Sequence, residues 1–483
     1  MRIKGIIIIF IICIGSSITS IMKNENLKDN DSKISLIQNQ NDFILNSEIF
    51  IEINDDQDFI DLAFDGSGTE ENPYLIKDLI ITSNYDIAIS IANTTKYFKI
   101  QNCTITTANL GIRIVDISPS TAIIYNNKLS DNSEYSIWLT NALGSEIINN
   151  TCTLCNRYGI WIEHCDDSII NGNNVTNGGY RFSGHGVWAF ISYVVEDNFV
   201  NGKPLGYFKQ QDNITIDDDT YGQLHFIACN NLTVRNQILE DTTMGIVVYH
   251  SPLAQLYNNT CNNNGWGINI ATESPYSIIE NNTCSNNYYF GIGMNYVSSN
   301  TTIRNNTIEG NLDRGIGLTR ISHTDVYNNT IKNNLVGIKL SISSYNSIFS
   351  NNIESNTEYG IYLRTDSNLN EIYHNILINN NLLGQSQAYD ECFSNKWYEE
   401  TLNQGNYWSD WTGTGIYEID GITNAFDPCP TFPYSDFPEC SYSPTTPTAS
   451  SPPPTLKLLG FTIGMFSISI IILFISFVKM KRK

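Results

Sequence analysis

The sequence predicts an all-β protein built as a parallel β-helix, a solenoid of 22–24-residue coils. Gly-Ile-type pairs recur with glycines 24, 24, 22 and 23 residues apart, at Gly267, Gly291, Gly315, Gly337 and Gly360. Asn-Asn pairs keep the same interval, at Asn258, Asn281, Asn305, Asn328 and Asn351. Between these markers apolar residues alternate in short runs, which is the period of strands, and no stretch has a helical stripe.

Each coil is expected to contain three short strands with glycine and asparagine at the corners. Asparagine suits a corner because it tolerates left-handed backbone angles, and stacked amides can bond from coil to coil. We therefore expect the first asparagine of each pair to turn a corner. The inward-facing isoleucines should form one buried column, made of Ile268, Ile292, Ile316 and Ile338.

The chain before and around the repeats divides into four predicted segments. Residues 1–20 have a basic start, an apolar run and a small-residue exit, which is the pattern of a signal peptide. Residues 21–63 are expected to form an N-terminal segment and cap. The β-helix is predicted over 64–390, with an insertion around 201–221, and 391–440 are expected to form a C-terminal cap.

The end of the chain predicts a membrane anchor. Residues 441–455 are rich in Pro, Ser and Thr, which is typical of a stiff stalk. Residues 456–478 contain an uncharged apolar run, Leu458 to Val478, long enough to cross a bilayer. The basic residues 479–483 should stay in the cytoplasm. We expect a single-pass cell-membrane protein with an extracellular ectodomain.

Charge narrows the possible partners. The formal net charge is -22 over 483 residues, and only 16% of the residues are charged. Nucleic acid binding requires clustered Lys and Arg. No nucleic acid partner is therefore expected, and contact with a membrane is expected only through the C-terminal helix.

The cysteines and histidines predict disulfides rather than a metal. Three cysteines lie close together at the end of the folded part, and in an oxidising compartment they are the disulfide candidates: Cys392, Cys429 and Cys440. Cys152 and Cys155 form a CxxC, but zinc sites of this kind need a second one. The six histidines are scattered without ligand spacing. No metal and no other cofactor are expected.

Three further passages resemble a known family. They are "FDGSGTEENPYLIKDLII" from Phe64, "VNGKPLGYF" followed by "GQLHFIACNNLTVRN", and "GNYWSDWTGTGIYEIDG" from Gly405. With the repeats, they resemble NosD-like proteins, also called CASH (carbohydrate-binding and sugar-hydrolysis) domains, over Phe64 to about Tyr434. The resemblance implies a right-handed β-helix. It carries little about function, since proteins of one fold do different things, and copper is suggested by the NosD name alone.

Aligning the coils by their Gly-Ile position places one outward residue after each pair. These residues are Arg113, Trp138, Trp161, Trp188, Val247, Asn269, Gly293, Gly317, Lys339 and Tyr362. Outward residues of successive coils stack about 4.8 Å apart, so the three tryptophans are predicted to form an aromatic ladder. The second outward position adds Thr140, Glu163 and Phe190, with His164 at the adjacent corner.

A flat aromatic strip beside polar groups suits sugar rings. The candidate carbohydrate-binding residues are Trp138, Trp161, Trp188, Glu163, His164 and Phe190. The alternative is that the insertion around 201–221 folds over the strip and buries it. We expect a surface β-helix that binds a glycan or surface polymer, or mediates adhesion, without performing chemistry.

Two other functions remain open. "CDDS" (Asp166, Asp167) and "GHG" (around His185) resemble the polygalacturonase signature, in which paired carboxylates act as acid and base. The register predicts different corners for Asp166 and His185, so the catalytic residues of a polysaccharide hydrolase or lyase stay unknown. A purely structural surface rod would need no site at all.

Overall fold

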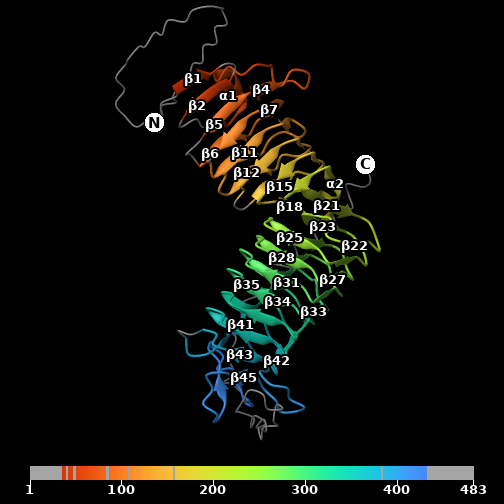
Figure 1. Ribbon diagram of the computed structural model, residues 1–483, viewed down its shortest axis with the longest axis vertical. Helices are drawn as coiled ribbons and strands as arrows, with labels where there is room; N and C mark the ends of the chain where they lie inside the picture. Colours follow the sequence, from red (N-terminus) through yellow and green to blue (C-terminus); the bar gives the residue numbers. More distant parts are fainter. Residues whose placement is uncertain are drawn as a thin grey trace, which may run out of the picture. The chain divides into compact units, whose positions relative to one another are not determined.

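The computed structural model is a parallel β-helix, as predicted (Figure 1). The structure describes residues 35–39, 42–46, 51–82, 86–106, 108–155, 158–381 and 384–431. The predicted signal peptide, stalk, transmembrane segment and cytoplasmic tail lie outside these residues. Within the described residues no helix has the length and hydrophobicity needed to cross a membrane.

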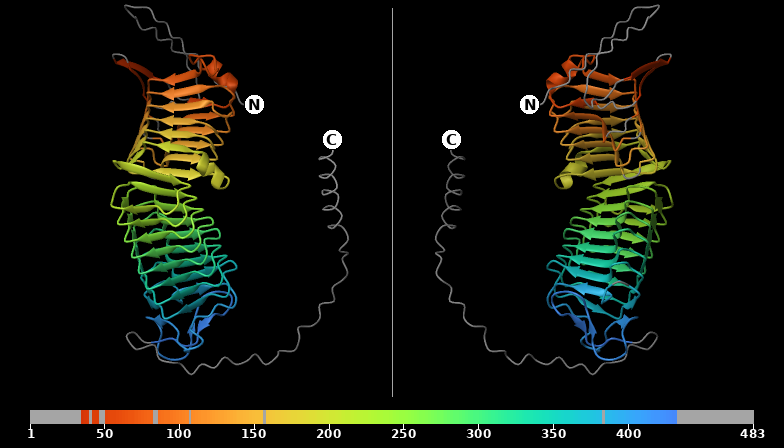
Figure 2. Two further views of the ribbon diagram at one scale, coloured as in Figure 1. Left: turned by 90° about the vertical axis from the view of Figure 1, so that its right-hand side faces the viewer. Right: turned by 90° about the vertical axis from the view of Figure 1, so that its left-hand side faces the viewer.

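The coils form two stacks that share one sheet (Figure 2). The N-terminal stack has two six-stranded sheets of its own among the described residues. One contains β3 (Ile51–Ile53), β6 (Ile87–Ala92), β9 (Leu110–Val115), β12 (Tyr135–Thr140), β15 (Tyr158–Glu163) and β18 (Tyr180–Ser183). The other contains β4 (Tyr74–Lys77), β7 (Phe98–Gln101), β10 (Ala122–Tyr125), β13 (Glu146–Ile148), β16 (Ile169–Asn171) and β19 (Val194–Glu196).

The C-terminal stack has two eight-stranded sheets over the described residues. One contains β22 (Thr215–Asp217), β24 (Thr233–Arg235), β27 (Gln255–Tyr257), β30 (Ile278–Glu280), β33 (Thr302–Arg304), β36 (Asp325–Tyr327), β39 (Ser347–Phe349) and β42 (Glu371–Tyr373). The other contains β25 (Ile238–Glu240), β28 (Thr260–Asn262), β31 (Thr283–Ser285), β34 (Thr307–Glu309), β37 (Thr330–Lys332), β40 (Asn352–Glu354), β43 (Ile376–Ile378) and β45 (Tyr407–Trp408).

A 17-stranded sheet runs through both stacks. Its N-terminal part is β1 (Ser35–Asn39), β2 (Asp42–Asn46), β5 (Leu79–Thr82), β8 (Thr104–Thr106), β11 (Lys128–Ser130), β14 (Thr151–Thr153), β17 (Asn174–Val175) and β20 (Phe199–Val200). Its C-terminal part is β21 (Lys203–Lys209), β23 (Gln223–Ile227), β26 (Met244–Tyr249), β29 (Trp266–Ala271), β32 (Phe290–Asn295), β35 (Arg314–Thr319), β38 (Val336–Ser341), β41 (Tyr359–Arg364) and β44 (Ala388–Asp390).

The two parts of this sheet meet at an antiparallel hairpin between β20 and β21, and β21 then pairs in parallel with β23. Asn201 and Gly202 form the turn, both with positive φ, as a two-residue hairpin of the primed type requires. The predicted insertion at 201–221 therefore contributes a strand to the solenoid. Among the described residues, the ring and cation–π neighbours of Trp138 and Trp161 come from β9, β12, β15 and β18 and not from this segment.

The core is made of inward columns, and each stack has its own hydrophobic cluster. The predicted column of Ile268, Ile292, Ile316 and Ile338 is confirmed, because these residues pair in register and are fully buried. Complete removal of these side chains from water supplies the main stabilisation of each coil.

In four coils the first asparagine of each pair turns a corner, as predicted. Asn258, Asn281, Asn305 and Asn328 turn corners with φ between 52° and 57°. The following asparagines are buried and form a ladder, in which each side-chain amide donates to the amide oxygen one coil further on. In the fifth coil Ser350 takes the corner, and Asn351 belongs to the buried ladder.

The ends of the stacks are closed by large side chains. α1 (Asp56–Asp61) is capped by Asp55 and buries Phe59 against Tyr74 at the N-terminal end. Trp397 and Trp408 are almost fully buried at the C-terminal end, where β46 (Tyr417–Glu418) pairs with β47 (Phe426–Asp427). Strands β2 and β3 already belong to the sheets of the β-helix, so the solenoid begins before residue 64.

The disulfide prediction is confirmed for one cysteine and wrong for another. Cys429 is disulfide-bonded. Cys392 is a buried thiol that accepts a hydrogen bond from the backbone N–H of Ser367, because it occupies the inward serine position of the last coils. Cys440 lies outside the described residues.

Candidate binding groove at the junction of the two stacks

Outward side chains of the N-terminal stack form a column with aromatic members. Arg113, Trp138, Trp161 and Arg181 pair in register on β9, β12, β15 and β18. The indoles of Trp138 and Trp161 stack at 5.4 Å between ring centroids. The predicted ladder is confirmed for these two tryptophans, and an arginine takes the third position.

Trp188 and Phe190 are not members of the column. Both lie on α2 (Val187–Ser192), a short helix that starts after Gly186. Trp188 is 73% exposed, and Phe190 is buried against Tyr249. The predicted position of both residues is wrong, because the strand of this coil begins at Tyr180, directly after Gly179.

Glu163 and His164 lie at the end of β15. Glu163 pairs with Thr140 in the second outward row, as predicted, and also with Ser183, which takes the place predicted for Phe190. His164 turns the adjacent corner with a φ of 50° and stacks on His185 at 3.8 Å between ring centroids. His185 therefore shares the corner of Asp166, and the prediction that the two lie at different corners is wrong.

Arg181 links the column to the C-terminal stack. Its guanidinium lies over the rings of Trp161 at 4.6 Å and Trp266 at 5.1 Å, and donates to the Tyr158 hydroxyl at 2.9 Å. Trp266 in turn stacks on Tyr289 at 4.5 Å. Each of the two ladder indoles thus has a flat neighbour on both sides, so it presents its edge rather than its face to solvent.

Gln223 joins the stacks by polar contacts. Its side-chain oxygen accepts from the backbone N–H of Tyr180 at 2.9 Å, and its amide nitrogen donates to the Tyr180 carbonyl at 2.7 Å. The Gln223 side chain therefore forms the two hydrogen bonds that a neighbouring strand would form with Tyr180 at the edge of β18. Gln223 also contacts His225, and burial lowers the pKa of His225 to about 3, which keeps this imidazole neutral.

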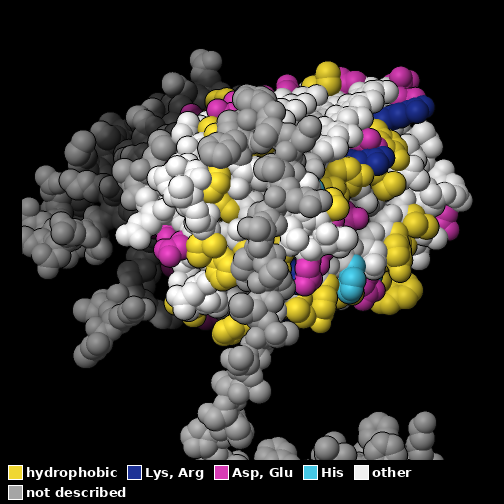
Figure 3. All heavy atoms as spheres, turned by 90° about the horizontal axis from the view of Figure 1, so that it is seen from below, with side chains coloured by type: hydrophobic (Ala, Val, Ile, Leu, Met, Phe, Trp, Pro, Cys, Tyr) yellow, Lys and Arg dark blue, Asp and Glu magenta, His cyan; other side chains and the backbone are white. Residues whose placement is uncertain are grey.

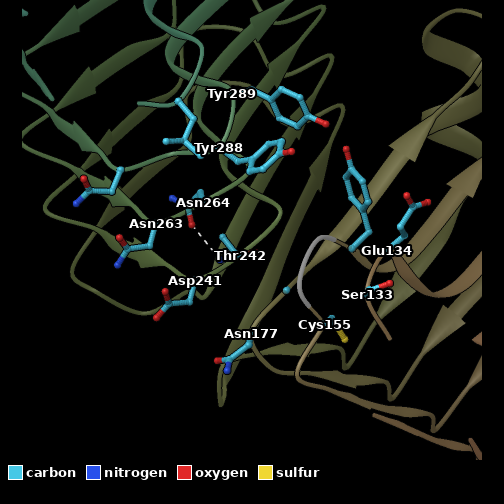
Figure 4. Close-up of a pocket in the computed structure, with 15 residues that line it drawn as sticks. Ser133, Glu134, Cys155, Asn177, Asp241, Thr242, Asn263, Asn264, Tyr288 and Tyr289 are labelled. Atoms are coloured by element: carbon cyan, nitrogen blue, oxygen red, sulfur yellow. Dashed lines mark hydrogen bonds between the residues drawn. The ribbon is translucent and has the colours of Figure 1, made fainter. Parts of the chain in front are cut away.

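A cavity of about 750 Å³ opens where the two stacks meet (Figure 4). We call it the junction groove. Its N-terminal wall includes the corner residues Ser133, Glu134, Cys155 and Asn177, and Tyr158 at the start of β15. Its C-terminal wall includes Asp241, Thr242, Asn263, Asn264, Tyr288 and Tyr289. Figure 4 shows the two tyrosines and two asparagines on one wall, with Glu134 on the other.

A second cavity of about 410 Å³ continues the groove. The two cavities share Asn177 and Asp241, and the second adds Glu240 and Lys203 to the lining. Lys203 forms an ion pair with Asp219 at 2.7 Å. An elongated space of this kind fits a chain of several units better than a single small molecule.

The lining offers hydrogen bonds and one exposed ring. Tyr288 is 55% exposed, so its ring is accessible for packing against a ligand. The hydroxyl of Thr242, a residue only 4% exposed, is buried at the cavity without a hydrogen-bond partner among the described residues. This oxygen is closed off from solvent and packs toward Gly179, where an added Cβ atom would lie 2.2 Å from it, so it is not exposed to a ligand in the groove.

Nucleophilic chemistry by the groove cysteine is disfavoured. Burial raises the pKa of Cys155 to about 11, and its sulfur lies 3.1 Å from the Ser136 hydroxyl. The thiolate, which is the reactive form, is therefore scarce near neutral pH.

The described residues do not fit a copper site. They contain no group of three or more His, Cys, Asp or Glu side chains arranged to hold a metal ion. The cysteines that could bind soft metals are buried in the inward columns.

The chain belongs to the right-handed β-helix family. The family described as "Right handed beta helix region" matches residues 62–221 and 207–331, which together cover more than half of the chain. The resemblance to NosD-like proteins is also confirmed, since the family described as "Periplasmic copper-binding protein (NosD)" matches residues 272–413. No curated protein matches the sequence.

Several solved structures are similar in fold. The mannuronan C-5 epimerase AlgE4 A-module of Azotobacter vinelandii is 16% identical, with a TM-score of 0.32 over 65% of this chain and 90% of its own. The periplasmic alginate epimerase AlgG is 15% identical, with a TM-score of 0.30 over 74% of this chain and 84% of its own. The Streptococcus pneumoniae surface protein and adhesin PfbA is 12% identical, with a TM-score of 0.20 over 71% and 91%.

Sequence reasoning missed the junction groove. Its walls come from corners more than a hundred residues apart, such as Glu134 and Tyr288. The two signals that pointed to it were the Tyr-Tyr pair before Gly291 and the Asn-Gly turn at Asn201, which marks where the repeat is interrupted.

Proposed function

We propose that this protein binds a glycan chain in the junction groove and performs no chemistry on it. The observation that carries the proposal is the lining of the groove, which combines the exposed ring of Tyr288 with amide, hydroxyl and carboxylate groups. Sugar rings pack their C–H faces on aromatic rings while their hydroxyls bond to polar neighbours. A cavity that continues into a second one supports a polymer as the ligand.

The tryptophan ladder has a supporting role in this proposal. Trp138 and Trp161 have neighbours on both faces, which leaves little room for sugar stacking. Their contribution is to hold Arg181 and Trp266 together across the junction, and so to fix the distance between the groove walls.

Tyr288→Ala tests the proposal. A glycan array on the purified full-length protein identifies ligands, and titration calorimetry then compares variants. We expect Tyr288→Ala to weaken binding by about 1–2 kcal/mol, roughly 5- to 30-fold, because it removes the exposed aromatic contact. Tyr345→Ala is the matched control, since Tyr345 is also 55% exposed but lies outside the groove.

Three outcomes would contradict the proposal. Equal binding by the two variants would show that the ligand binds outside the groove. If the protein bound no glycan, the proposed function would be wrong. If the bound glycan is shortened or gains unsaturated ends during incubation with protein, the protein is a hydrolase or lyase, and Glu134 and Asp241 become its candidate acids.

We also propose that the groove is displayed outside the cell on a membrane anchor. The support is the sequence alone, since the apolar run from Leu458 to Val478 and the basic tail lie outside the described residues. The protein should remain with membranes after a high-salt wash. Recovery in the soluble fraction would contradict the anchor.

A further inference from the structure

One corner of the C-terminal stack carries a continuous column of stacked residues. This corner lies between the 17-stranded sheet and the sheet that runs from β22 to β42. We call the column the corner ridge, and its members in successive coils are Leu253, Tyr276, Asn300, His323, Tyr345 and Leu369. The backbone N–H of each member donates a hydrogen bond to a carbonyl at the same corner of the next coil. With about 4.8 Å per coil, the corner ridge is about 24 Å long.

The backbone of the corner ridge is left-handed at every member. The φ angles lie between 53° and 62°. Asparagine adopts this conformation readily, whereas leucine and tyrosine adopt it at a cost in conformational free energy. The coils on either side have small polar residues at this corner, Asn213 and Asn231 before the corner ridge and Ser394 after it. The leucines and tyrosines of the corner ridge therefore occupy positions for which the backbone alone favours asparagine.

Burial of the leucine and tyrosine side chains does not offset this cost. Tyr276 and Tyr345 are 58% and 55% exposed, and Leu253 and Leu369 are each 44% exposed. Among the described residues, none of the four belongs to the hydrophobic cluster of the C-terminal stack. A column of exposed apolar side chains marks a surface that binds a partner.

The surface beside the corner ridge is also apolar. Val297 and Ile342 lie at neighbouring positions of the same corner and are 64% and 43% exposed. Both have positive φ angles, 64° and 53°, which are uncommon for β-branched residues. The apolar surface is therefore wider than a single column.

The corner ridge has the same order of residues from both ends at its outer positions. Leucine lies at each end, tyrosine lies next to each leucine, and the exposed fractions within each pair are nearly equal. A twofold axis between two identical molecules pairs residue i with residue j and residue j with residue i. An axis through the middle of the corner ridge would therefore place Leu253 against Leu369 of a second copy. It would also place Tyr276 against Tyr345 of that copy.

We infer that two copies of this protein associate side by side and antiparallel through the corner ridge. The partner is a second copy of the chain, because the order of the exposed residues fits a twofold contact. The inference goes beyond the proposed function, since no member of the corner ridge lines either cavity of the junction groove. Glycan binding should therefore not depend on this association.

Charge makes this corner suitable for contact between two acidic molecules. The net charge of -22 means that two copies repel each other over much of their surface. The corner segments of the ridge coils are residues 250–253, 272–276, 296–300, 320–323, 342–345 and 365–369. They contain two carboxylates, Glu273 and Asp366, and one guanidinium, Arg320, which gives a formal charge of -1. On the face seen in Figure 3, Lys and Arg side chains occur in separate places and form no continuous patch that would attract a second acidic copy.

The same charges favour an antiparallel pair over a parallel one. In a parallel twofold pair each residue of the corner would lie against itself, so Arg320 would meet Arg320 and Glu273 would meet Glu273. Like charges placed together across an interface are unfavourable. In the antiparallel pair Arg320 lies opposite the coil of Val297, and Glu273 lies opposite the coil of Ile342, so these like charges are kept apart.

Analytical ultracentrifugation of the full-length protein in detergent measures the association. We expect a dimer whose fraction rises with protein concentration. Tyr276→Asn and Tyr345→Asn should each raise the dissociation constant of the dimer at least about tenfold, because each removes an aromatic contact from the interface. Their melting temperatures should equal or exceed that of the wild type, because asparagine suits the left-handed corner. Trp188→Ala is the matched control and should leave the dissociation constant unchanged, since this exposed indole lies on α2.

Cross-linking with a short bismaleimide tests the orientation. A mixture of Leu253→Cys and Leu369→Cys should give a cross-linked dimer that contains one copy of each variant. Each variant alone should give no more cross-linked product than the wild type, because its two introduced thiols would lie about 24 Å apart.

A wild type that stays monomeric at every concentration would overturn the inference and leave the proposed function standing. A dimer that is unaffected by both tyrosine substitutions, or weakened equally by Trp188→Ala, would also overturn it. Lower melting temperatures in both asparagine variants would show that the tyrosines stabilise the single copy, and would overturn the inference as well. Cross-linking within either cysteine variant alone would contradict the antiparallel arrangement.

Discussion

Asp427 shows how a single buried carboxylate is held at the C-terminal end of the solenoid. It is fully buried and accepts hydrogen bonds from the indole N–H of Trp408 at 2.9 Å and from the backbone N–H groups of Asn406 at 2.7 Å and Cys429 at 2.9 Å. These donors favour the charged form. Burial outweighs them and raises the pKa of Asp427 to about 6.

This raised pKa predicts a pH dependence of stability. The folded protein takes up the proton at higher pH than the unfolded chain, whose Asp pKa is about 3.9. The contribution of Asp427 to the free energy of unfolding is therefore fully present below about pH 4 and declines as the pH rises to about 6. The decline should be about 3 kcal/mol, since one pKa unit corresponds to about 1.4 kcal/mol.

Asp427→Asn isolates this effect. Urea unfolding of both proteins should give a stability difference, wild type minus variant, that decreases between about pH 4 and about pH 6.5. A constant difference over this range would show that Asp427 does not titrate there.

At the residue scale the sequence predicted most inward and corner positions, because the repeat fixes them. The exceptions have local causes. Asn351 was predicted at a corner, but Ser350 takes the corner and Asn351 therefore lies in the buried ladder. Cys392 was predicted to be in a disulfide, and it fills an inward position where other coils have serine.

At the scale of elements, Trp161 is packed inside the outward column, whereas Trp188 lies on α2 and is exposed. We expect Trp161→Ala to lower the free energy of unfolding by about 2–3 kcal/mol, because it removes a ring packed between Trp138 and Arg181. Trp188→Ala should change it by about 0.5 kcal/mol or less, since that indole is 73% exposed.

Denaturant unfolding of the two variants side by side is the measurement. If Trp188→Ala destabilised the protein as much as Trp161→Ala, the register described for β15 and β18 would be wrong.

The regular coils could be predicted as elements, whereas the segment around α2 and β21 could not. Gly159 is followed by Gly179 after 20 residues and by Gly186 after 27, and neither spacing matches the 22–24-residue period. The sequence prediction took Gly186 as the strand-start glycine of this coil, and it therefore placed Trp188 and Phe190 on a strand. The chain instead continues the strand from Tyr180 and uses Gly186, with a φ of 80°, to begin a short helix.

At the scale of the whole solenoid, the junction groove exists because the repeat is interrupted. The hairpin at Asn201 and Gly202 ends one stack and starts the next, so corners of the two stacks face each other. No single coil contains this site. A sequence repeat shows what neighbouring coils share. It therefore predicts the regular coils, and it does not predict the structure at the junction, where the repeat is interrupted.

The central claim is that a glycan occupies the junction groove and touches both walls. Hydrogen–deuterium exchange of the full-length protein, with and without a saturating concentration of a glycan identified on the array, tests it most directly. The account predicts slower exchange on both walls together, at residues 133–134 and at residues 263–265, with no change at the corner of Tyr345. Slower exchange confined to one wall, or confined to the strands of Trp138 and Trp161, would contradict it.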